Sequence, residues 1–484
     1  MRTTVAVLDK CGGNAVSAVA SVLAKSLPES NCHYWLATPV GIATGKNAQF
    51  LCQQELDSAV AVGSASTASE SVDAQMSKTQ DALIAFEGRI YTPTTKGTTI
   101  NAVSTKIQGN YEKAASAFLG DVEGDFALVI AEAEKMLAAR DPVGVQPLYY
   151  GETQNIAALA SNRKTLWKLG ITEPKSFPPG HLGTVTKEGF KFKPVLTLTF
   201  SEPKPISMDD AAKKLQKLLE QSVRQRVSGL REVAVAFSGG LDSSVVACLA
   251  QKCGVDVHLV HVSLEGQSET DEARKAADLL GLPLQVHIFR EADLEMVTPK
   301  VVGLIEEPDP IKAAVGVPFF WNAQKTADAG YRVMLAGQGA DELFGGYQRY
   351  VIEYIAKGDL AVRKTMFHDV VVIHESNIER DEKICGFHDV ELRLPFASYE
   401  IADFAMNLPT ELKFEPKVDS LRKLVLRKVA TNLHLPADIA EKPKKAVQYS
   451  TGISSALKKL AKRKNLTLGE YVNRIFQEEK KQDS

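Results

Sequence analysis

The chain has 484 residues, of which 44% are hydrophobic and 24% are charged, and its formal net charge is −2. That length allows two or three globular domains, each with its own core, and the composition is ordinary for a soluble protein. The small net charge argues against a protein that binds nucleic acid or a membrane surface over its whole face. No apolar run approaches the roughly 18 residues of a membrane span.

The cysteines and the first residues indicate a cellular compartment. The six cysteines lack a Cys-x-x-Cys pair and are scattered along the chain, at positions 11, 32, 52, 248, 253 and 385. In a chain of this size that scatter predicts reduced structural thiols, neither a disulfide scaffold nor a zinc site. The first residues carry no cleavable signal pattern. We therefore expect a cytoplasmic protein without nucleic-acid or membrane partners.

The first 200 residues have a β-rich pattern. Short apolar segments bounded by glycine, proline or charge predict strands at residues 83–86, 126–130 and 195–200, and residues 15–27 have helical spacing. This mixture predicts an α+β domain with antiparallel sheets over residues 1–200. Residues 201–208 contain Pro203 and Pro205, which break regular structure and predict a linker.

The remaining residues, 209–484, have a different pattern. A charged amphipathic helix is predicted to about residue 227, and residues 233–237 and 257–262 are apolar runs typical of buried parallel strands. Residues 244–252 and 270–280 have helical spacing, and the residues beyond 421 are helical and rich in lysine. Strands that alternate with helices predict a doubly wound parallel α/β domain with a helical tail.

The segment Ser238-Gly239-Gly240-Leu241-Asp242-Ser243-Ser244 lies between a predicted strand and a predicted helix. Its glycines allow a sharp turn, and the helix that follows offers unpaired amides to an anion. The hydroxyls of its serines add donors. A carboxylate beside phosphates requires a cation, so Asp242 implies Mg²⁺. A simple structural turn is the alternative, but turn chemistry needs neither the acid nor the hydroxyls.

This loop resembles the pyrophosphate-binding signature of the N-type ATP pyrophosphatases, and the rest of residues 210–455 resembles asparagine synthetase. The stretches that carry the second resemblance are residues 337–347 (GQGADELFGGY), 391–396 (ELRLPF), 421–423 (LRK) and 442–444 (KPK). Several departures make the chain look closer to the divergent asparagine-synthetase-domain-containing branch. The family resemblance implies ATP and Mg²⁺ as cofactors.

The resemblance also implies roles for particular residues. Asp242 and Asp341 match the two acids that hold Mg²⁺, and Lys444 matches the lysine that neutralises charge on the α-phosphate. Gln338 and Glu342 fall at catalytic positions. The implied ATP-binding residues are Ala236, Phe237, Ser238, Gly239, Gly240, Asp242, Ser243, Ser244, Val262, Ala336 and Gly337.

The implied chemistry has two steps. A carboxylate, taken to be that of aspartate, attacks the α-phosphate of ATP to give an acyl-adenylate and pyrophosphate. An amine then displaces AMP and forms an amide. The partners expected are therefore small molecules, a carboxylate amino acid and ammonia, while the sequence leaves a homodimer open.

The amino-terminal part resembles a glutaminase domain with the αββα sandwich of the N-terminal-nucleophile amidotransferases, on residues 125–130, 139–150 and 178–181. Such enzymes use an amino-terminal cysteine whose α-amine acts as base. Arg2 stands at the matching position, and we interpret Cys11 as structural. Glu87 and Gly88 lie where the family usually shows an Asn-Gly-Glu segment. We therefore predict ammonia, not glutamine, as the nitrogen donor.

Other departures concern the synthetase half. Gln338 stands where bacterial asparagine synthetases carry glutamate, and an amide cannot act as a general base. Ala397 and Ser398 replace a usual Leu-Asp, and residues 311–318 lack an arginine often found there, although Lys312 could substitute. Two alternatives stay open: a ligase with another substrate, similar to the β-lactam synthetases, and a non-catalytic regulatory homologue.

Overall fold

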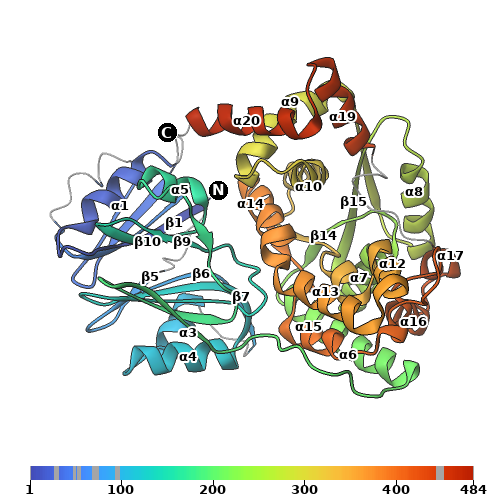
Figure 1. Ribbon diagram of the computed structural model, residues 1–484, viewed down its shortest axis with the longest axis horizontal. Helices are drawn as coiled ribbons and strands as arrows, with labels where there is room; N and C mark the ends of the chain where they lie inside the picture. Colours follow the sequence, from blue (N-terminus) through green and yellow to red (C-terminus); the bar gives the residue numbers. More distant parts are fainter. Residues whose placement is uncertain are drawn as a thin grey trace. The chain divides into compact units, whose positions relative to one another are not determined.

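A computed structural model describes residues 2–26, 32–46, 51, 56–67, 76–92, 99–442 and 452–482 of the chain. The chain divides into two compact units, Met1–Thr197 with Lys481–Ser484, and Leu198–Lys480 (Figure 1). Lys444 lies outside the described residues. Among the helices that are described, none combines the length and the apolar character needed to cross a membrane.

The amino-terminal unit contains two antiparallel sheets. The first has the order β11 (Lys175–Ser176), β9 (Tyr149–Glu152), β10 (Ile156–Ala160), β1 (Arg2–Asp9), β4 (Val60–Ser66), β2 (His33–Ala37), β3 (Ile42–Gly45). The second has the order β13 (Gly189–Pro194), β12 (His181–Thr186), β8 (Met136–Arg140), β7 (Glu123–Ala131), β6 (Leu83–Thr92), β5 (Met76–Lys78).

Alternating side chains of each strand supply two different cores, because successive residues of a strand point to opposite faces. Val5 and Val7 pack with α1 (Ala15–Ala24) on the outer face of the first sheet. Ala6 and Leu8 instead pack between the two sheets, against residues such as Leu83. The second sheet packs its outer face on α3 (Thr99–Lys106) and α4 (Tyr111–Asp121).

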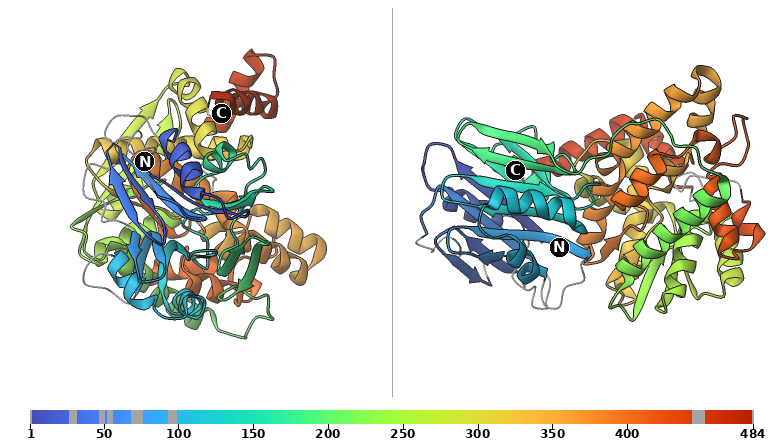
Figure 2. Two further views of the ribbon diagram at one scale, coloured as in Figure 1. Left: turned by 90° about the vertical axis from the view of Figure 1, so that its left-hand side faces the viewer. Right: turned by 90° about the horizontal axis from the view of Figure 1, so that it is seen from below.

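Another helix of this unit, α5 (Arg163–Lys168), joins α1 on the outside of the first sheet. Figures 1 and 2 show the resulting layers, helices, sheet, sheet and helices. The αββα sandwich predicted for this part is confirmed.

The carboxy-terminal unit is built on a five-stranded parallel sheet. Its order is β16 (Leu284–Phe289), β15 (Asp256–Leu264), β14 (Glu232–Ala236), β17 (Val333–Leu335), β18 (Glu391–Arg393). The helices before β18 are α6 (Met208–Val227), α7 (Leu241–Lys252), α8 (Glu269–Leu280), α9 (Glu291–Ile305), α10 (Pro310–Asp328), α11 (Ala340–Phe344), α12 (Gln348–Lys357), α13 (Asp359–Val371), a π-helical turn (His374–Ile378) and α14 (Glu379–Phe387). After β18 come α15 (Tyr399–Met406), a 3₁₀ turn (Thr410–Leu412), α16 (Leu424–Asn432), α17 (Ala437–Ala440), α19 (Ile453–Arg463) and α20 (Leu468–Gln482).

Helices cover both faces of this sheet, which explains why the strands β14 and β17 carry buried apolar residues on both of their faces. Val233 and Val235 belong to a core that α6, α7, α15 and α16 share. Met334 points to the other face, where its sulfur accepts a hydrogen bond from Thr326 of α10 at 3.4 Å. The doubly wound domain predicted for this part is confirmed.

One predicted strand is wrong. Residues 195–200 form no strand, and the last strand of the unit is β13, which ends at Pro194. The amides of Val195 and Leu196 instead bind the carbonyl oxygen of Gly180. Because proline has no N–H to donate, Pro194 marks the point where the chain leaves the sheet.

Lys413 is a buried lysine of the carboxy-terminal unit. Lys413 is only 4% exposed and directly follows the 3₁₀ turn Thr410–Leu412. Burial, with a smaller contribution from the Arg363 guanidinium, lowers the pKa of the Lys413 ammonium to about 7. The folded unit therefore holds Lys413 neutral at mildly alkaline pH.

This burial predicts a pH-dependent stability. Between pH 7 and 10.5 the unfolded state binds the Lys413 proton and the folded state does not, so the free energy of unfolding should rise with pH across that window. Lys413→Met should remove this rise. Urea unfolding of both proteins at several pH values, followed by circular dichroism, measures the difference. Parallel pH profiles for the two proteins would contradict the assignment.

Candidate active site

The carboxyl ends of β14 and β17 meet at one edge of the parallel sheet. The chain reaches β14, β15 and β16 in order on one side and then returns to place β17 on the other side of β14. In open α/β sheets, ligands bind outside the strand ends at such a reversal of strand order. The loops that leave β14 and β17 carry most of the residues for which the sequence predicted a role.

The loop after β14 has the form of an anion site. Gly239 adopts φ +68°, a conformation that disfavours any residue with a side chain. In addition, a Cβ there would lie 2.8 Å from the Cα of Ala273 in α8, too close for a real contact. Gly240 caps α7 without a side-chain hydrogen bond, which leaves the first amides of this helix available. The Ser238 and Ser243 hydroxyls lie 3.3 Å apart and hold the turn together.

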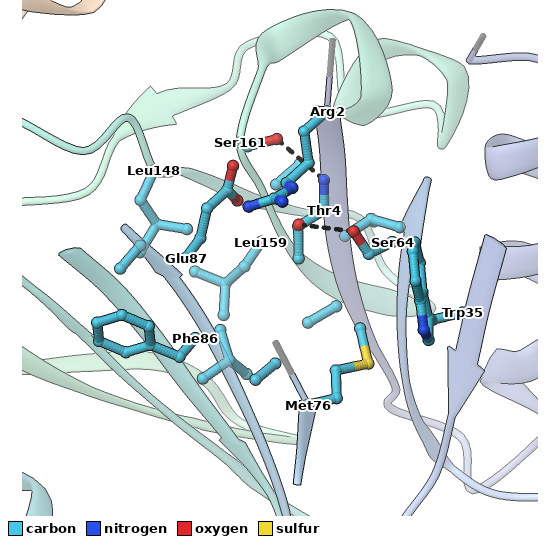
Figure 3. A pocket seen from close by; sticks show the side chains of 16 residues that line it. Arg2, Thr4, Trp35, Ser64, Met76, Phe86, Glu87, Leu148, Leu159 and Ser161 are labelled. Atoms are coloured by element: carbon cyan, nitrogen blue, oxygen red, sulfur yellow. Dashed lines mark hydrogen bonds between the residues drawn. The ribbon is translucent and has the colours of Figure 1, made fainter. Parts of the chain in front are cut away.

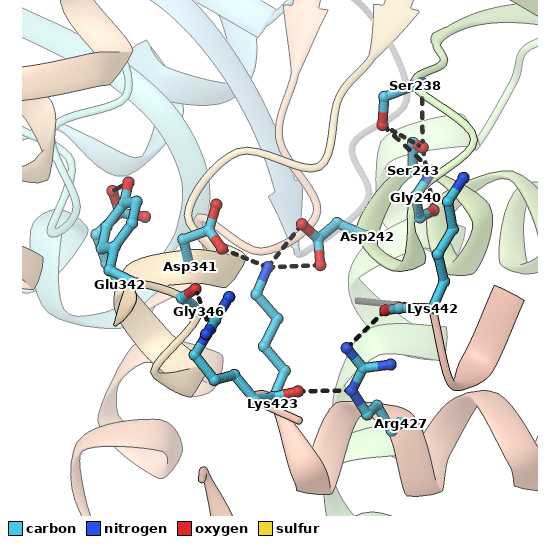
Figure 4. A network of polar contacts seen from close by, with 12 residues as sticks. Ser238, Gly240, Asp242, Ser243, Asp341, Glu342, Gly346, Lys423, Arg427 and Lys442 are labelled. Atoms are coloured by element: carbon cyan, nitrogen blue, oxygen red, sulfur yellow. Dashed lines mark hydrogen bonds and ion pairs between the residues drawn. The ribbon is translucent and has the colours of Figure 1, made fainter. Parts of the chain in front are cut away.

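Two carboxylates from the two loops converge on one ammonium group (Figure 4). Lys423 Nζ donates to Asp242 Oδ1 at 2.7 Å and to Asp242 Oδ2 at 2.6 Å, and it lies 2.7 Å from Asp341 Oδ1. The Lys423 side chain is 2% exposed. The positive charge therefore compensates two acids that would otherwise repel each other.

The same two acids fit a divalent cation. Magnesium typically takes one or two carboxylates and completes its shell with water and phosphate oxygens. Within the described residues no group of three or more His, Cys, Asp or Glu side chains could hold a metal alone. A cation at Asp242 and Asp341 would therefore depend on ligands from a bound molecule, as in a metal–nucleotide complex.

Close backbone packing fixes the position of both acids. A Cβ on Gly337 would lie 2.8 Å from Asp242 Cβ, and a Cβ on Gly346 would overlap Asp341 Oδ1 and Lys423 Cε. Lys423 itself adopts the left-handed conformation, with φ 60° and ψ 41°, which costs a non-glycine residue about 1–3 kcal/mol. Strain of this kind concentrates at functional sites, where the surrounding structure maintains it.

Gln338 pairs with an acid for which the sequence predicted no role. Its Nε2 donates to Asp381 Oδ2 at 2.6 Å. Arg380 binds the same carboxylate through Nε to Oδ1 at 2.7 Å and through Nη2 to Oδ2 at 3.1 Å. Burial raises the pKa of Asp381, and the Arg380 guanidinium and the Gln338 amide oppose that rise.

Glu342 lies in a second set of hydrogen bonds. Tyr347 donates its hydroxyl to Glu342 Oε1 at 2.6 Å, and Asn377 donates Nδ2 to the same oxygen at 2.8 Å. Arg380 Nη1 reaches Asn377 Oδ1 at 3.4 Å, so the two sets are connected. Burial and the neighbouring Asp341 raise the pKa of Glu342. Glu342 is 4% exposed, a position suited to supporting the loop that carries Asp341.

The other predicted site residues lie at the same edge of the sheet. Ala236 ends β14, Ala336 follows β17, and Val262 lies near the carboxyl end of β15. Lys442 is the last described residue before position 444 and pairs with Glu272 at 2.7 Å. Lys423 belongs to a sequence motif for which no role was predicted. Arg380 and Asp381 were not predicted at all, since no local pattern links them to Gln338.

Arg2, at the position where the sequence analysis expected a nucleophile, lies at the start of β1 and faces Glu87 of β6 (Figure 3). Burial raises the pKa of Glu87, and the Arg2 charge opposes this rise. The pocket beside this pair is otherwise largely apolar, with Phe86, Leu148 and Leu159 in its wall. Cys11 is an exposed free thiol located after β1.

Comparison with known families gives two matches. The family described as asparagine synthase matches residues 214–359 and 353–480, and the family described as glutamine amidotransferase domain matches residues 68–168. The first match contains all of the loops that carry Asp242, Asp341 and Lys423. The second lies in the αββα sandwich.

Two relatives agree with the first of these matches. A protein of Methanocaldococcus jannaschii named "Putative asparagine synthetase (glutamine-hydrolyzing) 1" is 33% identical over 392 residues, 71% of this chain and 72% of the relative. The asparagine synthetase (glutamine-hydrolyzing) of Sandersonia aurantiaca is 28% identical over 362 residues, 71% of this chain and 67% of the relative. A solved structure titled as the allosteric regulatory enzyme of purine biosynthesis matches 60% of this chain and 80% of its own, with 12% identity and a TM-score of 0.34.

The packing at Gly346 gives a prediction for nucleotide binding. Gly346→Ala should displace Asp341 or Lys423 and weaken Mg·ATP binding, measured by calorimetry, at least about tenfold, since misplacement near 1 Å is costly in such sites. Gly386→Ala is the matched control, because a Cβ at Gly386 meets no atom within 4 Å. Equal affinities for the two variants would show that the acids need not lie where they do.

The pairing of Lys423 gives a prediction for the metal. Lys423→Met removes the buried ammonium group that both carboxylates contact, and breaking a buried pair in this way should destabilise the unit by about 3–5 kcal/mol. Added Mg²⁺ should raise the unfolding temperature of this variant more than that of the parent protein.

Lys428→Met is the control for this experiment. Lys428 lies on the same helix, α16, but pairs with Asp209 in an exposed position, where an ion pair contributes little. Its unfolding temperature and its response to Mg²⁺ should match those of the parent protein. A Lys423→Met variant that responds to Mg²⁺ no more than this control would contradict a metal site between the two acids.

Proposed function

This chain belongs to the asparagine synthetase family, and from that premise we propose that it activates the carboxylate of aspartate with ATP and transfers it to ammonia. The family is one of ATP-dependent carbon–nitrogen ligases that act on small molecules. The products proposed here are asparagine, AMP and pyrophosphate. We propose that the reaction takes place in the cytoplasm.

The observation that carries this proposal is the convergence of Asp242 and Asp341 beside an uncapped helix end. Two acids around one cation and a glycine turn with free amides together suit the triphosphate of a nucleotide. A Mg²⁺ ion held by Asp242 and Asp341 would neutralise charge on the departing pyrophosphate. Neither feature would be needed by a purely structural domain.

In the first step the chain binds and orients the triphosphate. The amides at the start of α7 donate to phosphate oxygens, and the Ser238 hydroxyl, which is exposed, adds a donor. In this proposal the Lys423 ammonium group, which contacts the two carboxylates in the structure, donates to the phosphates once they are bound. Lys444 stabilises the α-phosphate as the substrate carboxylate attacks it, a role that rests on the family resemblance.

In the second step ammonia attacks the acyl carbon and AMP leaves with the electron pair of the broken C–O bond. Gln338 lies in the loop after β17, directly beyond the glycine that packs on Asp242. A glutamine cannot remove the proton of the amine, so in this proposal the proton passes to a phosphate oxygen of AMP.

The choice of ammonia rests on the amino-terminal part, which we propose to be a degenerate glutaminase domain over residues 1–200, joined by the linker 201–208 to the ligase domain 209–484. Arg2 faces a half-buried carboxylate, Glu87, and its charge lowers the pKa of that group, where glutaminase chemistry requires a thiol and an α-amine. Converting that pair to a nucleophile would leave Glu87 without its compensating charge.

A second candidate keeps the activation step and changes the carboxylate, as the β-lactam synthetases do. The observation in its favour concerns Lys312. This residue could have replaced the missing arginine as the cation that binds the carboxylate of aspartate. Lys312 instead forms an ion pair with Glu307, and its side chain is 14% exposed. In this second candidate, residues other than Lys312 recognise the carboxylate substrate.

The deciding experiment is pyrophosphate release by the purified protein with Mg·ATP and aspartate, with ammonium or glutamine as nitrogen donor. We expect release and asparagine formation with ammonium and little with glutamine. Lys444→Ala should abolish release without unfolding the protein.

Each other outcome has a definite meaning. Equal rates with both donors would refute the degenerate glutaminase. Release with a different carboxylate, and none with aspartate, would favour the second candidate. Binding of ATP without release for any carboxylate would leave a non-catalytic homologue.

A further inference from the structure

The loop after β17 lacks a carboxylate that the resemblance leads one to expect, and the structure supplies one from another element. Gln338 replaces the glutamate of bacterial asparagine synthetases. Asp381 of α14, distant in sequence, lies 2.6 Å from Gln338 Nε2. A carboxylate therefore lies beside residue 338, but it comes from a different residue.

The pairing determines which end of the Gln338 amide is free. An ionised carboxylate only accepts hydrogen bonds, so Asp381 must face the NH₂ group of Gln338. The carbonyl oxygen Oε1 then points away from Asp381, and no described residue donates to it. Because the Gln338 side chain is half-buried, a ligand can reach this acceptor.

The acceptor lies beside the predicted phosphate site. Gly337, which precedes it, packs so closely on Asp242 that a Cβ would lie 3.2 Å from the main-chain carbon of that residue. Asp341 follows three residues later. Gln338 is thus next to the residue that packs on Asp242 and three residues before Asp341, the two acids expected to bind the metal.

Charge balance explains why Gln338 and Asp381 depend on each other. Arg380 binds Asp381 through two nitrogens, and the two side chains are only 2% and 0% exposed. One buried guanidinium compensates one buried carboxylate. A glutamate at 338 would add a second carboxylate without a further cation, which is costly in a desolvated position.

We infer that Asp381 is a positioning residue for the amine step: it fixes the Gln338 amide so that Oε1 accepts an N–H of the incoming amine. This inference rests on the proposed function and adds a residue to it. Oε1 orients the nitrogen lone pair toward the acyl carbon, the C–N bond forms, the C–O bond to AMP breaks, and the proton leaves with the AMP phosphate. Gln338 and Asp381 together retain the acceptor of the family glutamate without its basicity.

The test compares two readouts in the full-length protein. Asp381→Asn should leave aspartate-dependent ATP–pyrophosphate exchange within about twofold and raise the KM for ammonium about tenfold or more, because the amide can then turn over. Gln338→Met removes the acceptor, keeps the Arg380–Asp381 pair, and should raise the same KM. Asp328→Asn, an exposed carboxylate paired with Lys325, is the control and should change neither readout.

An exchange of the two groups tests the coupling directly. Gln338→Glu alone should lose about tenfold or more in amide formation, and Gln338→Glu combined with Asp381→Asn should recover most of it, since one carboxylate then again faces one guanidinium. An unchanged KM for ammonium in both Asp381→Asn and Gln338→Met, or additive losses in the double variant, would overturn the inference. A parent protein that shows no aspartate-dependent exchange would instead refute the proposed function, and the inference with it.

Discussion

Two carboxylates and one lysine meet at the carboxyl edge of the parallel sheet, and the surrounding structure is organised around their charges. Asp242 and Asp341 come from loops that follow neighbouring strands, so the strand order alone brings them together. Two carboxylates that lie close enough to contact the same nitrogen atom require a cation between them. In the free protein the Lys423 ammonium provides it, at the cost of a left-handed backbone and of two glycines packed without room for side chains.

The residues behind this centre form a second layer that is also balanced in charge. Consecutive hydrogen bonds connect Gln338, near the start of the loop after β17, with Glu342 at its other end. They pass through Asp381, Arg380 and Asn377. Asn377 belongs to a π-helical turn, His374–Ile378, a distortion that often accompanies functional sites, and Arg380 and Asp381 follow it in α14. The loop that carries Asp341 is therefore held from both sides.

The amino-terminal unit keeps a different balance. Its αββα layers are complete, with separate cores on the outer faces and between the sheets. At the start of β1, Arg2 lies opposite the half-buried Glu87, beside a largely apolar pocket. The Arg2 charge offsets part of the desolvation of Glu87, which gives a physical reason for the two residues to stay together.

Local patterns in the sequence determined the two folds and the loop at Ser238–Ser244, because apolar periodicity, glycine turns and helix starts act over a few residues. The strand predicted at residues 195–200 is wrong because its local pattern does not include the contact with Gly180. That contact and Pro194 decide where the chain leaves the sheet. Only the tertiary structure decided that Lys423 lies between the two acids and that Asp381 faces Gln338. Those contacts join residues 181 and 43 positions apart, and a single sequence holds no local signal for the partner of a buried charge.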